Sequence, residues 1–448
     1  MATPRDHDAV HSGHSSMPRG IVVTGATGFV GGELLKRLLR RDDGRTIVCP
    51  VRAESDDAAE VRGSTTLSRL LGRDPRPYEA DRVEWIRGDL EEVRLGWSND
   101  TWIRVARQTN EVFHCAAVSL DAPLDEAHRV NVTGTVHGHQ LALTAHNLHR
   151  RFRRFHHLSS AYVAGRTTAR VHASYLPNDR AHHYRNAHER TKARAERYLR
   201  ASAVASERNR VPISIYRPSI VAGDTHGGRT TSWNALYEPM KMAALGRLPH
   251  FPHGGRALVD AVGVDVVVDA MLALGETAHC DLHAYHLTAG PSAFTIRELL
   301  DRTIRRALEY EDFEPSPTVL LNIAKWTAMA AAAKVSARAP KTFGRGRTHA
   351  PAGVQRFARW SSHLPYTMVN TIFDNSREQA LLRRFGIHQP DGSDYLESII
   401  GYALDTRFGA IAPPVIEPVA RPAIEPSTGY VRRNADNRAS VLELLADP

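Results

Sequence analysis

No apolar run of 18 or more residues occurs in this 448-residue chain, so the sequence predicts no membrane-spanning helix. The first 17 residues, MATPRDHDAVHSGHSSM, lack the apolar core of a secretion signal, and we expect a disordered leader there. Cysteine is scarce, and Cys49, Cys115 and Cys280 show neither metal-like nor disulfide-like spacing. Reduced thiols and a cytoplasmic location are therefore expected, and peripheral membrane contact stays open.

Histidine and arginine are abundant, but neither indicates a site by itself. Among the 24 histidines, pairs such as His182 and His183 have no cysteine or carboxylate at ligand spacing, so no metal site is predicted. The net charge of +9 suits nucleic acid, a membrane surface or an anionic substrate, yet no nucleic-acid-binding module accompanies it. The basic stretch from Lys334 to Arg347 indicates either a solvated loop or a contact for a phosphopantetheine arm or carrier protein.

A glycine-rich turn follows the first apolar strand. Residues 21–31 read IVVTGATGFVG, with glycines at Gly25, Gly28 and Gly31, and the helical pattern GELLKRLL continues from there. In such a turn the first glycine allows the bend, the second admits a pyrophosphate, and the third lets helix and strand pack closely. The helix N-terminus offers unpaired N–H groups to the phosphates. The pattern predicts a bound dinucleotide.

Strand and helix patterns alternate up to about residue 222, as in TIVCPVR, STTLSRLLG and VEWIRGDL. This alternation favours an α/β fold with a doubly wound parallel sheet. The region from Asp312 to about Gly409 has helical patterns, and we assign it to a smaller, largely helical C-terminal lobe. The Pro-rich sequence that follows predicts an extended strap, and SVLELLA predicts a short terminal helix.

The TGxxGxxG spacing resembles that of the extended short-chain dehydrogenase/reductase family, and other landmarks of that family follow in order. They are GDL at residues 88–90, FHCAA at 113–117, an asparagine in RVNVTGT, SSAY at 159–162 and YRPSIV at 216–221. The resemblance implies a Rossmann-type fold. It also implies cofactor contacts from Thr24, Gly25, Thr27, Gly28, Phe29, Val30, Gly31, Asp89, Leu90, Ala116, Ala117, Asn131, Lys192, Pro218, Ser219 and Ile220.

Within that family the strings SSAYVAG, NAHERTKARAE and YRPSIVAGD are similar to the fatty acyl-CoA reductase and thioester reductase branch, with its male-sterility-type NAD-binding domain. The distal FDNSREQALLRRFGI is similar too, so the resemblance covers most of residues 18–408. Members of the branch reduce acyl thioesters to aldehydes, and some continue to the alcohol. The resemblance implies acyl-CoA or an acyl carrier protein as partner, and it indicates no oligomeric state.

Composition and the resemblance together divide the chain into four parts. We expect a disordered leader at 1–17, an NADP-binding domain at 18–290 with a substrate-loop insertion at about 225–257, a substrate lobe at 291–409, and a Pro-rich strap with a short helix at 410–448.

Cofactor preference depends on the end of the second strand, CPVRA. NAD enzymes place an acidic side chain there, whereas a 2′-phosphate needs a cation. The first acidic residue is Glu54, while Arg52 can form a forked contact with a phosphate, and Arg40 or Arg41 could assist. The alternative is that Arg52 is only a surface residue. We expect NADPH/NADP+ as the cofactor.

The resemblance implies a catalytic hydroxyl, a tyrosine, and a lysine four residues after the tyrosine on one helix face. Ser160 occupies the hydroxyl position and Lys192 the lysine position, but His188 stands where the family has tyrosine. We therefore assign Ser160, His188 and Lys192 as the catalytic residues.

The missing tyrosine leaves several readings. His188 transfers the proton in a reduction, or Tyr184 or Tyr162 supplies the phenol instead. His188 could also act as the base of a lyase, isomerase or cyclase, since a neutral imidazole is a competent base near pH 7. The last alternative is a redox-silent, NADP-binding scaffold or regulator. The sequence favours an NADPH-dependent thioester reductase.

Overall fold

The computed structural model describes residues 20–41, 43–204, 210–233, 236–245, 257–277, 282–310 and 370–411. Several expectations lie outside these residues. They are the leader at 1–17, Cys280, the basic stretch from Lys334 to Arg347, and nearly all of the strap at 410–448. Within the described part of the chain, no helix has both the length and the apolar character needed to cross a membrane.

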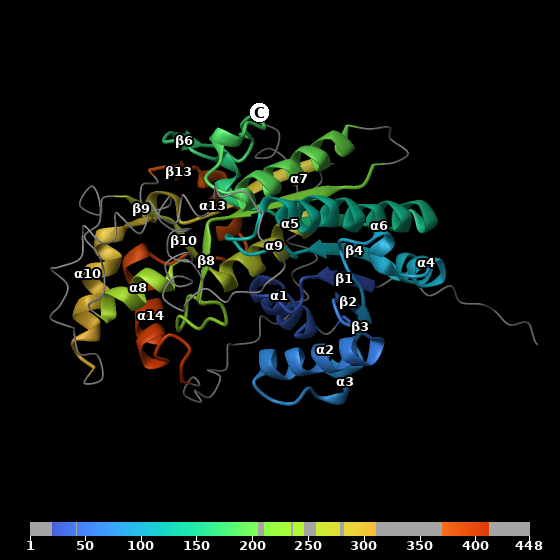
Figure 1. Cartoon of the computed structure of the whole chain (residues 1–448), viewed down its shortest axis with the longest axis horizontal. Helices are drawn as coiled ribbons and strands as arrows, with labels where there is room; N and C mark the ends of the chain where they lie inside the picture. The colour runs from blue at the N-terminus through green and yellow to red at the C-terminus, as the bar shows by residue number, and fades with distance from the viewer. Residues whose placement is uncertain are drawn as a thin grey trace, which may run out of the picture.

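A seven-stranded parallel sheet forms the centre of the molecule (Figure 1). Its strand order is β11-β7-β5-β4-β1-β2-β3. The strands are β1 (Gly20–Thr24), β2 (Ile47–Val51), β3 (Val83–Arg87), β4 (Thr109–His114), β5 (Arg154–Leu158), β7 (Ile213–Pro218) and β11 (Leu282–Leu287). The chain moves in one direction from β1 to β3 and in the other from β4 to β11, which confirms the doubly wound sheet.

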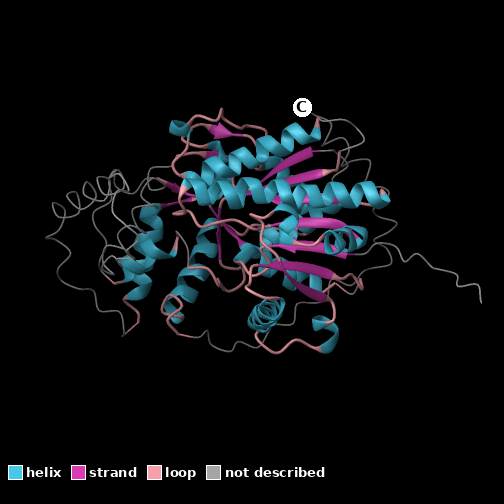
Figure 2. Cartoon of the chain, turned by 45° about the vertical axis from the view of Figure 1, so that its right-hand side comes forward, coloured by secondary structure: helices cyan, strands magenta, loops and turns pink. Residues whose placement is uncertain are grey.

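Helices cover both faces of this sheet, as the cyan and magenta layers of Figure 2 show. Successive strand side chains point to opposite faces, so Ile21 and Val23 join one core while Val22 joins the other. The first core includes α1 (Phe29–Leu39), α2 (Asp56–Leu71), α9 (Val264–Thr277) and α13 (Ser376–Arg383). The second includes α4 (Asn99–Gln108), α6 (Gly134–His149) and α7 (Ala187–Ala203).

A third core lies in a smaller lobe beside the sheet, formed by α8 (Tyr237–Ala244), α10 (Ile296–Ala307) and α14 (Gly392–Asp405). Two short strand pairs join it, β8 (Ile220–Ala222) with β10 (Ala261–Gly263), and β9 (Leu258–Val259) with β12 (Phe294–Thr295). Figure 1 shows α8, α10 and α14 together on one side. By contrast, β13 (Ile372–Phe373) pairs with β6 (Arg170–Val171), and α13 packs on the main sheet. The described C-terminal residues therefore contribute to both parts.

The remaining helices are short. They are α3 (Pro77–Ala80), α5 (Leu124–His128), the π-helical turn η2 (Arg129–Thr133), and the 3-10 turns η1 (Val93–Gly96), η3 (Ala161–Ala164), η4 (Ala181–His183) and η7 (Gly290–Ser292). The strand order reverses between β1 and β4, so the loops after these two strands meet at the carboxyl edge of the sheet. In open α/β sheets this is where ligands bind.

Candidate active site

The turn after β1 has the geometry that a dinucleotide needs. Gly25 has a φ of +73°, and a Cβ there would lie 2.7 Å from the backbone nitrogen of Ala116. A Cβ on Gly31 would overlap the carbonyl oxygen of Gly25. Helix α1 starts after the exposed Gly28, and among the described residues no side chain caps it and no acidic residue occupies its first turn. Its first N–H groups are thus available to an anion, and the turn fits the pyrophosphate of the cofactor.

Most of the other predicted cofactor residues lie along the same edge. Ala117 is exposed and Ala116 half-buried just after β4, so backbone is accessible there. Asp89 follows β3, and its Oδ1 accepts the N–H of Glu91 at 2.9 Å. The remainder are half-buried or buried at the ends of β1, β3 and β7: Thr27, Phe29, Val30, Leu90, Pro218, Ser219 and Ile220.

Arg52 follows β2 at this edge, and its side chain is 70% exposed. Its Nη1 lies 3.7 Å from Oε1 of Glu91, whose Oε2 accepts a 2.7 Å hydrogen bond from Nε of Arg129. An exposed pair of this length is weak, so the Arg52 guanidinium remains accessible to a phosphate.

The structure does not place Arg40 and Arg41 where the sequence suggested. Helix α1 has 11 residues and spans about 16 Å, which carries both arginines to its far end. There Arg41 donates a 2.8 Å hydrogen bond to Glu276. The suggestion that they assist in phosphate binding is therefore wrong, because the length of α1 separates them from the glycine turn.

The side chains of Thr24 and Asn131, two predicted cofactor residues, form hydrogen bonds to other residues of the protein. Thr24 Oγ1 lies 3.0 Å from Nδ1 of His114 and ties the end of β1 to β4. Asn131, in η2, is fully buried, accepts from Val118 N at 3.2 Å and donates to Thr191 Oγ1 at 3.0 Å. Asn131 thus links α7 to the loop after β4, which corresponds to a positioning role.

Helix α7 carries two of the three predicted catalytic residues, His188 and Lys192, on one face. Asn186 caps it by accepting the N–H of Glu189 at 2.9 Å, and His188 and Lys192 then lie one turn apart. The Lys192 ammonium is almost fully buried and donates a 2.7 Å hydrogen bond to the carbonyl oxygen of Leu158. Burial lowers the pKa of Lys192 to about 8, although Cys115 and Glu196 oppose this.

His188 is half-buried, and its Nδ1 lies 3.2 Å from the carbonyl oxygen of Val118. Burial and the nearby Lys192 ammonium lower the pKa of His188 to about 4, against the opposing effect of the Val118 carbonyl. Two other histidines, His114 and His157, stack behind Lys192 with ring centres 5.7 Å apart. Burial and then Lys192 lower the pKa of His114 to about 3 and that of His157 well below its usual value. All three imidazoles are neutral at pH 7.

Ser160 stands between β5 and η3. Its Oγ accepts the N–H of Tyr162 at 3.2 Å, so its own hydroxyl hydrogen can be donated to a substrate oxygen. The turn that it caps packs against α7, the helix of His188 and Lys192. The structure therefore brings Ser160, His188 and Lys192 to the ends of β4 and β5, beside the glycine turn after β1.

Tyr184 and Tyr162, the two candidates for a catalytic phenol, contact other residues of the protein. The Tyr184 hydroxyl accepts a 2.8 Å hydrogen bond from Arg197 and lies 3.4 Å from the carbonyl oxygen of Pro177. Tyr162 is buried edge-on against Phe373, with ring centres 5.4 Å apart. Neither arrangement offers a phenol in place of the missing tyrosine.

A buried ionic network was not found from the sequence. Glu196 accepts hydrogen bonds from Ser159 Oγ at 2.5 Å and from Arg217 Nε at 2.9 Å, and neither charged side chain is exposed. Arg217 also donates to the carbonyl oxygens of Ala173 and Tyr175 at 2.7 and 2.8 Å. A signal was available, because Arg217 is a charged residue inside the apolar strand ISIYRP.

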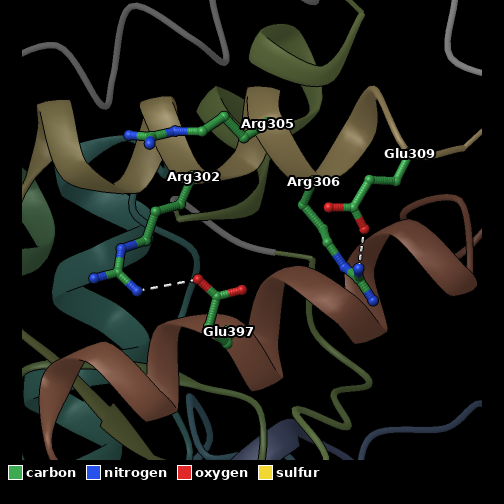
Figure 3. Close-up of a pocket in the computed structure, with 5 residues that line it drawn as sticks. All are labelled: Arg302, Arg305, Arg306, Glu309 and Glu397. Carbon is green, nitrogen blue, oxygen red and sulfur yellow. Dashed lines mark hydrogen bonds and ion pairs between the residues drawn. The ribbon is translucent and has the colours of Figure 1, made fainter.

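A separate depression of about 330 Å³ lies between α10 and α14 (Figure 3). Arg302 donates to Glu397 at 3.0 Å and to Glu298 at 3.1 Å, and Arg306 pairs with Glu309. These arginines already have acidic partners, so the depression does not indicate an anion site.

The fold and the glycine turn define an NAD(P)-binding domain of the extended short-chain dehydrogenase/reductase type. The family model described as "Male sterility protein" matches residues 23–271, more than half of the chain. The chain therefore belongs to the male sterility protein family, which confirms the resemblance found in the motifs.

Three relatives illustrate this membership. The chain is 29% identical over 278 residues to the non-canonical nonribosomal peptide synthetase cpsA of Aspergillus campestris, covering 60% of this chain and 25% of the relative. It is 28% identical over 296 residues to the carboxylic acid reductase of Mycobacterium tuberculosis, covering 61% and 25%. It is 28% identical over 311 residues to fatty acyl-CoA reductase 1 of Mus musculus, covering 61% and 58%. The matched region is thus only part of each relative.

Solved structures share the fold. The terminal R domain of the myxalamid PKS-NRPS biosynthetic pathway has a TM-score of 0.67 at 22% identity, covering 89% of this chain and 93% of that domain. A reductase (R) domain of a nonribosomal peptide synthetase from Mycobacterium tuberculosis has a TM-score of 0.62 at 21% identity, covering 88% and 92%.

Proposed function

We propose that this protein is an NADPH-dependent reductase that converts an acyl thioester into an aldehyde. One observation carries the proposal: Ser160, His188 and Lys192 meet at the switch point of the sheet, beside a glycine turn that fits a dinucleotide. The names of the relatives support it, since they include a carboxylic acid reductase and a fatty acyl-CoA reductase.

The side chains of this site would each have a distinct task. A nicotinamide cofactor held at the glycine turn would supply the hydride that the thioester carbonyl carbon accepts. Ser160 donates its hydroxyl hydrogen to the carbonyl oxygen and stabilises the negative charge that develops there. Neutral His188 leaves that oxygen unprotonated, so its electron pair can re-form the carbonyl as the carbon–sulfur bond breaks. The Lys192 ammonium holds the cofactor ribose and contributes positive charge.

The preference for NADPH over NADH belongs to this proposal. Arg52 is exposed just after β2 and only weakly paired with Glu91, so it can form a charge-assisted contact with a 2′-phosphate. The position directly after β2, where NAD enzymes carry an acidic side chain, holds Arg52 in this chain.

The acyl group would arrive on coenzyme A or on an acyl carrier protein, both of which present a phosphopantetheine thioester. Strands β8 and β10 connect the carboxyl edge of the sheet to the lobe of α8, α10 and α14. We propose that this lobe, within the predicted 291–409 segment and the 225–257 insertion, contacts the acyl chain.

A second candidate is a base-catalysed, non-reductive reaction. The neutral state of His188 favours it, because an unprotonated imidazole is a general base near pH 7. Under this alternative the thioester is consumed while NADPH is not.

One experiment separates the two. The full chain is incubated with NADPH and a panel of acyl-CoA and carrier-bound thioesters, while absorbance at the NADPH band and trapped aldehyde are followed together. Equal loss of NADPH and gain of aldehyde supports the reductase. Thioester consumption at constant NADPH supports the base-catalysed candidate, and no reaction with either carrier rejects the substrate class.

A further inference from the structure

The contact between His188 and Val118 fixes which ring nitrogen carries hydrogen. A backbone carbonyl oxygen only accepts, so Nδ1 of His188, 3.2 Å from Val118 O, must be the protonated nitrogen. A neutral imidazole has one N–H, and therefore Nε2 carries a lone pair. The depressed pKa of His188, about 4 through burial and Lys192, keeps the ring in this neutral form at pH 7.

The surroundings hold this orientation in place. The N–H of Val118 is bound by Asn131 Oδ1 at 3.2 Å, and Asn131 Nδ2 donates to Thr191 Oγ1 at 3.0 Å. Thr191 in turn donates to the carbonyl oxygen of Ala187 at 2.8 Å, on the same helix as His188. A flipped ring would lose the Val118 contact, so Nε2 remains an acceptor.

The other hydrogen donors near the site do not replace this nitrogen as an acid. The Lys192 ammonium is buried, donates one hydrogen to Leu158 O and, under the proposed function, directs the others to the cofactor ribose instead of the substrate oxygen. The Tyr184 hydroxyl is bound by Arg197, and Tyr162 is packed against Phe373. Ser160 can donate a hydrogen bond, but it is an aliphatic alcohol like the product, so giving up its proton would only move the negative charge to the serine.

We propose that the fixed acceptor face of His188 limits this enzyme to a single reduction, so that the aldehyde is its final product. This inference rests on the proposed thioester reduction and adds the oxidation level of the product. The residue that determines the product is His188, held by Val118 and Asn131.

The first reduction needs no acid at the position of His188. A thioester, reduced nicotinamide and one proton give an aldehyde, a thiol and oxidised nicotinamide. After hydride addition, the electron pair on oxygen re-forms the carbonyl while the carbon–sulfur bond breaks. The thiolate leaves readily, because thiols have a pKa of about 8.5, and it takes its proton from water.

A second reduction would differ at this step. An aldehyde, a second reduced nicotinamide and one proton would give an alcohol and oxidised nicotinamide. Hydride addition to the aldehyde forms an alkoxide with no leaving group, which is far more basic than a thiolate. Unless it is protonated as it forms, it returns the hydride to the oxidised nicotinamide, and Nε2 of His188 has no proton to give. General acids contribute about 10²- to 10⁴-fold, so aldehyde reduction should be slower than thioester reduction by about 10²-fold or more.

The test compares the wild-type full chain, His188→Tyr and the matched control His182→Tyr, which changes an exposed histidine outside the site. Each is given a medium-chain acyl-CoA with excess NADPH and, separately, the corresponding aldehyde. We expect one NADPH per thioester and only aldehyde from wild type and His182→Tyr. We expect two NADPH and alcohol from His188→Tyr. Alcohol from the wild type, or thioester reduction by His188→Tyr without alcohol, overturns the inference.

A second readout does not depend on turnover. Long-range ¹H–¹⁵N spectra of the histidine-labelled protein, assigned with His188→Phe, report the tautomer directly. An Nδ1–H ring with unprotonated Nε2 agrees with the inference, and an Nε2–H ring overturns it. If no thioester is reduced, the proposed function fails, while this spectrum still judges the His188 orientation.

Discussion

The ammonium of Lys192 donates a 2.7 Å hydrogen bond to the carbonyl oxygen of Leu158, two residues before Ser160. The contact joins α7 to the end of β5, and so sets the distance between the lysine and the hydroxyl of the site. Because the ammonium is buried, its charge is poorly screened and acts strongly on its neighbours. Lys192 therefore helps to lower the pKa of His188, and under the proposed function its charge also acts on cofactor and substrate.

Replacing Lys192 with methionine should remove this charge while keeping the side-chain length. We expect the rate of thioester reduction to fall by about 10²- to 10³-fold, as when one stabilising donor is removed from an active site. The matched control is Lys36→Met, since Lys36 forms only a partly exposed pair with Glu33. Steady-state rates of both variants check the prediction, and equal loss in the two would contradict it.

The rate of thioester reduction should have a rising and a falling limb as a function of pH. His188 is active when neutral, so the rate should rise with pH through its pKa of about 4. Lys192 is active when charged, so the rate should fall as pH rises through its pKa of about 8. Burial and Lys192 lower the pKa values of His114 and His157, so we expect neither to add a limb near pH 7.

The variant His188→Phe identifies the acidic limb. It should remove the limb near pH 4 but lower the plateau by much less than the roughly 10²- to 10⁴-fold that loss of a general acid or base costs, because phenylalanine also leaves the substrate oxygen unprotonated. Circular dichroism at each pH controls for unfolding. An unchanged limb in His188→Phe would assign it to another group.

Arg52→Ala tests the cofactor preference. A charge-assisted contact with the 2′-phosphate contributes about 1.5–3 kcal/mol, so the Kd for NADPH should rise by about 10- to 100-fold and that for NADH should stay constant. Arg41→Ala, which removes a pair with Glu276 at the far end of α1, should change neither. Fluorescence titration measures both constants. An equal loss for the two cofactors would mean that Arg52 does not recognise the phosphate.

The buried pair of Glu196 and Arg217 should govern stability. Burial alone would raise the pKa of Glu196, but Arg217 outweighs it and the pKa is lowered, so stability should be lost as pH falls through that lowered value. Arg217→Met leaves the buried Glu196 with Ser159 and the more distant Arg200, 3.7 Å away, and should cost up to about 3–5 kcal/mol of unfolding free energy. The double variant with Glu196→Gln should lose less than the sum of the single variants. Urea denaturation provides the comparison, and strict additivity would argue against coupling.

Local sequence was sufficient for much of this site. The glycines of the first turn and the alternation of strands and helices each follow from patterns within about ten residues. The contacts that define the chemistry span longer separations, as between Val118 and His188 or between Ser159 and Glu196. Such pairs depend on how loops and helices pack across the sheet, which periodicity does not encode. For the same reason the sequence did not predict that the amide of Asn131, a predicted cofactor residue, binds Val118 and Thr191.

The most direct test of the account follows the hydride itself. The full chain is mixed with an acyl thioester and NADPH carrying deuterium at C4, using each C4 epimer in turn, and the products are examined by mass spectrometry. The account predicts an aldehyde containing one deuterium from one of the two epimers, with a free thiol released in equal amount. Consumption of the thioester without deuterium in the product from either epimer would contradict it.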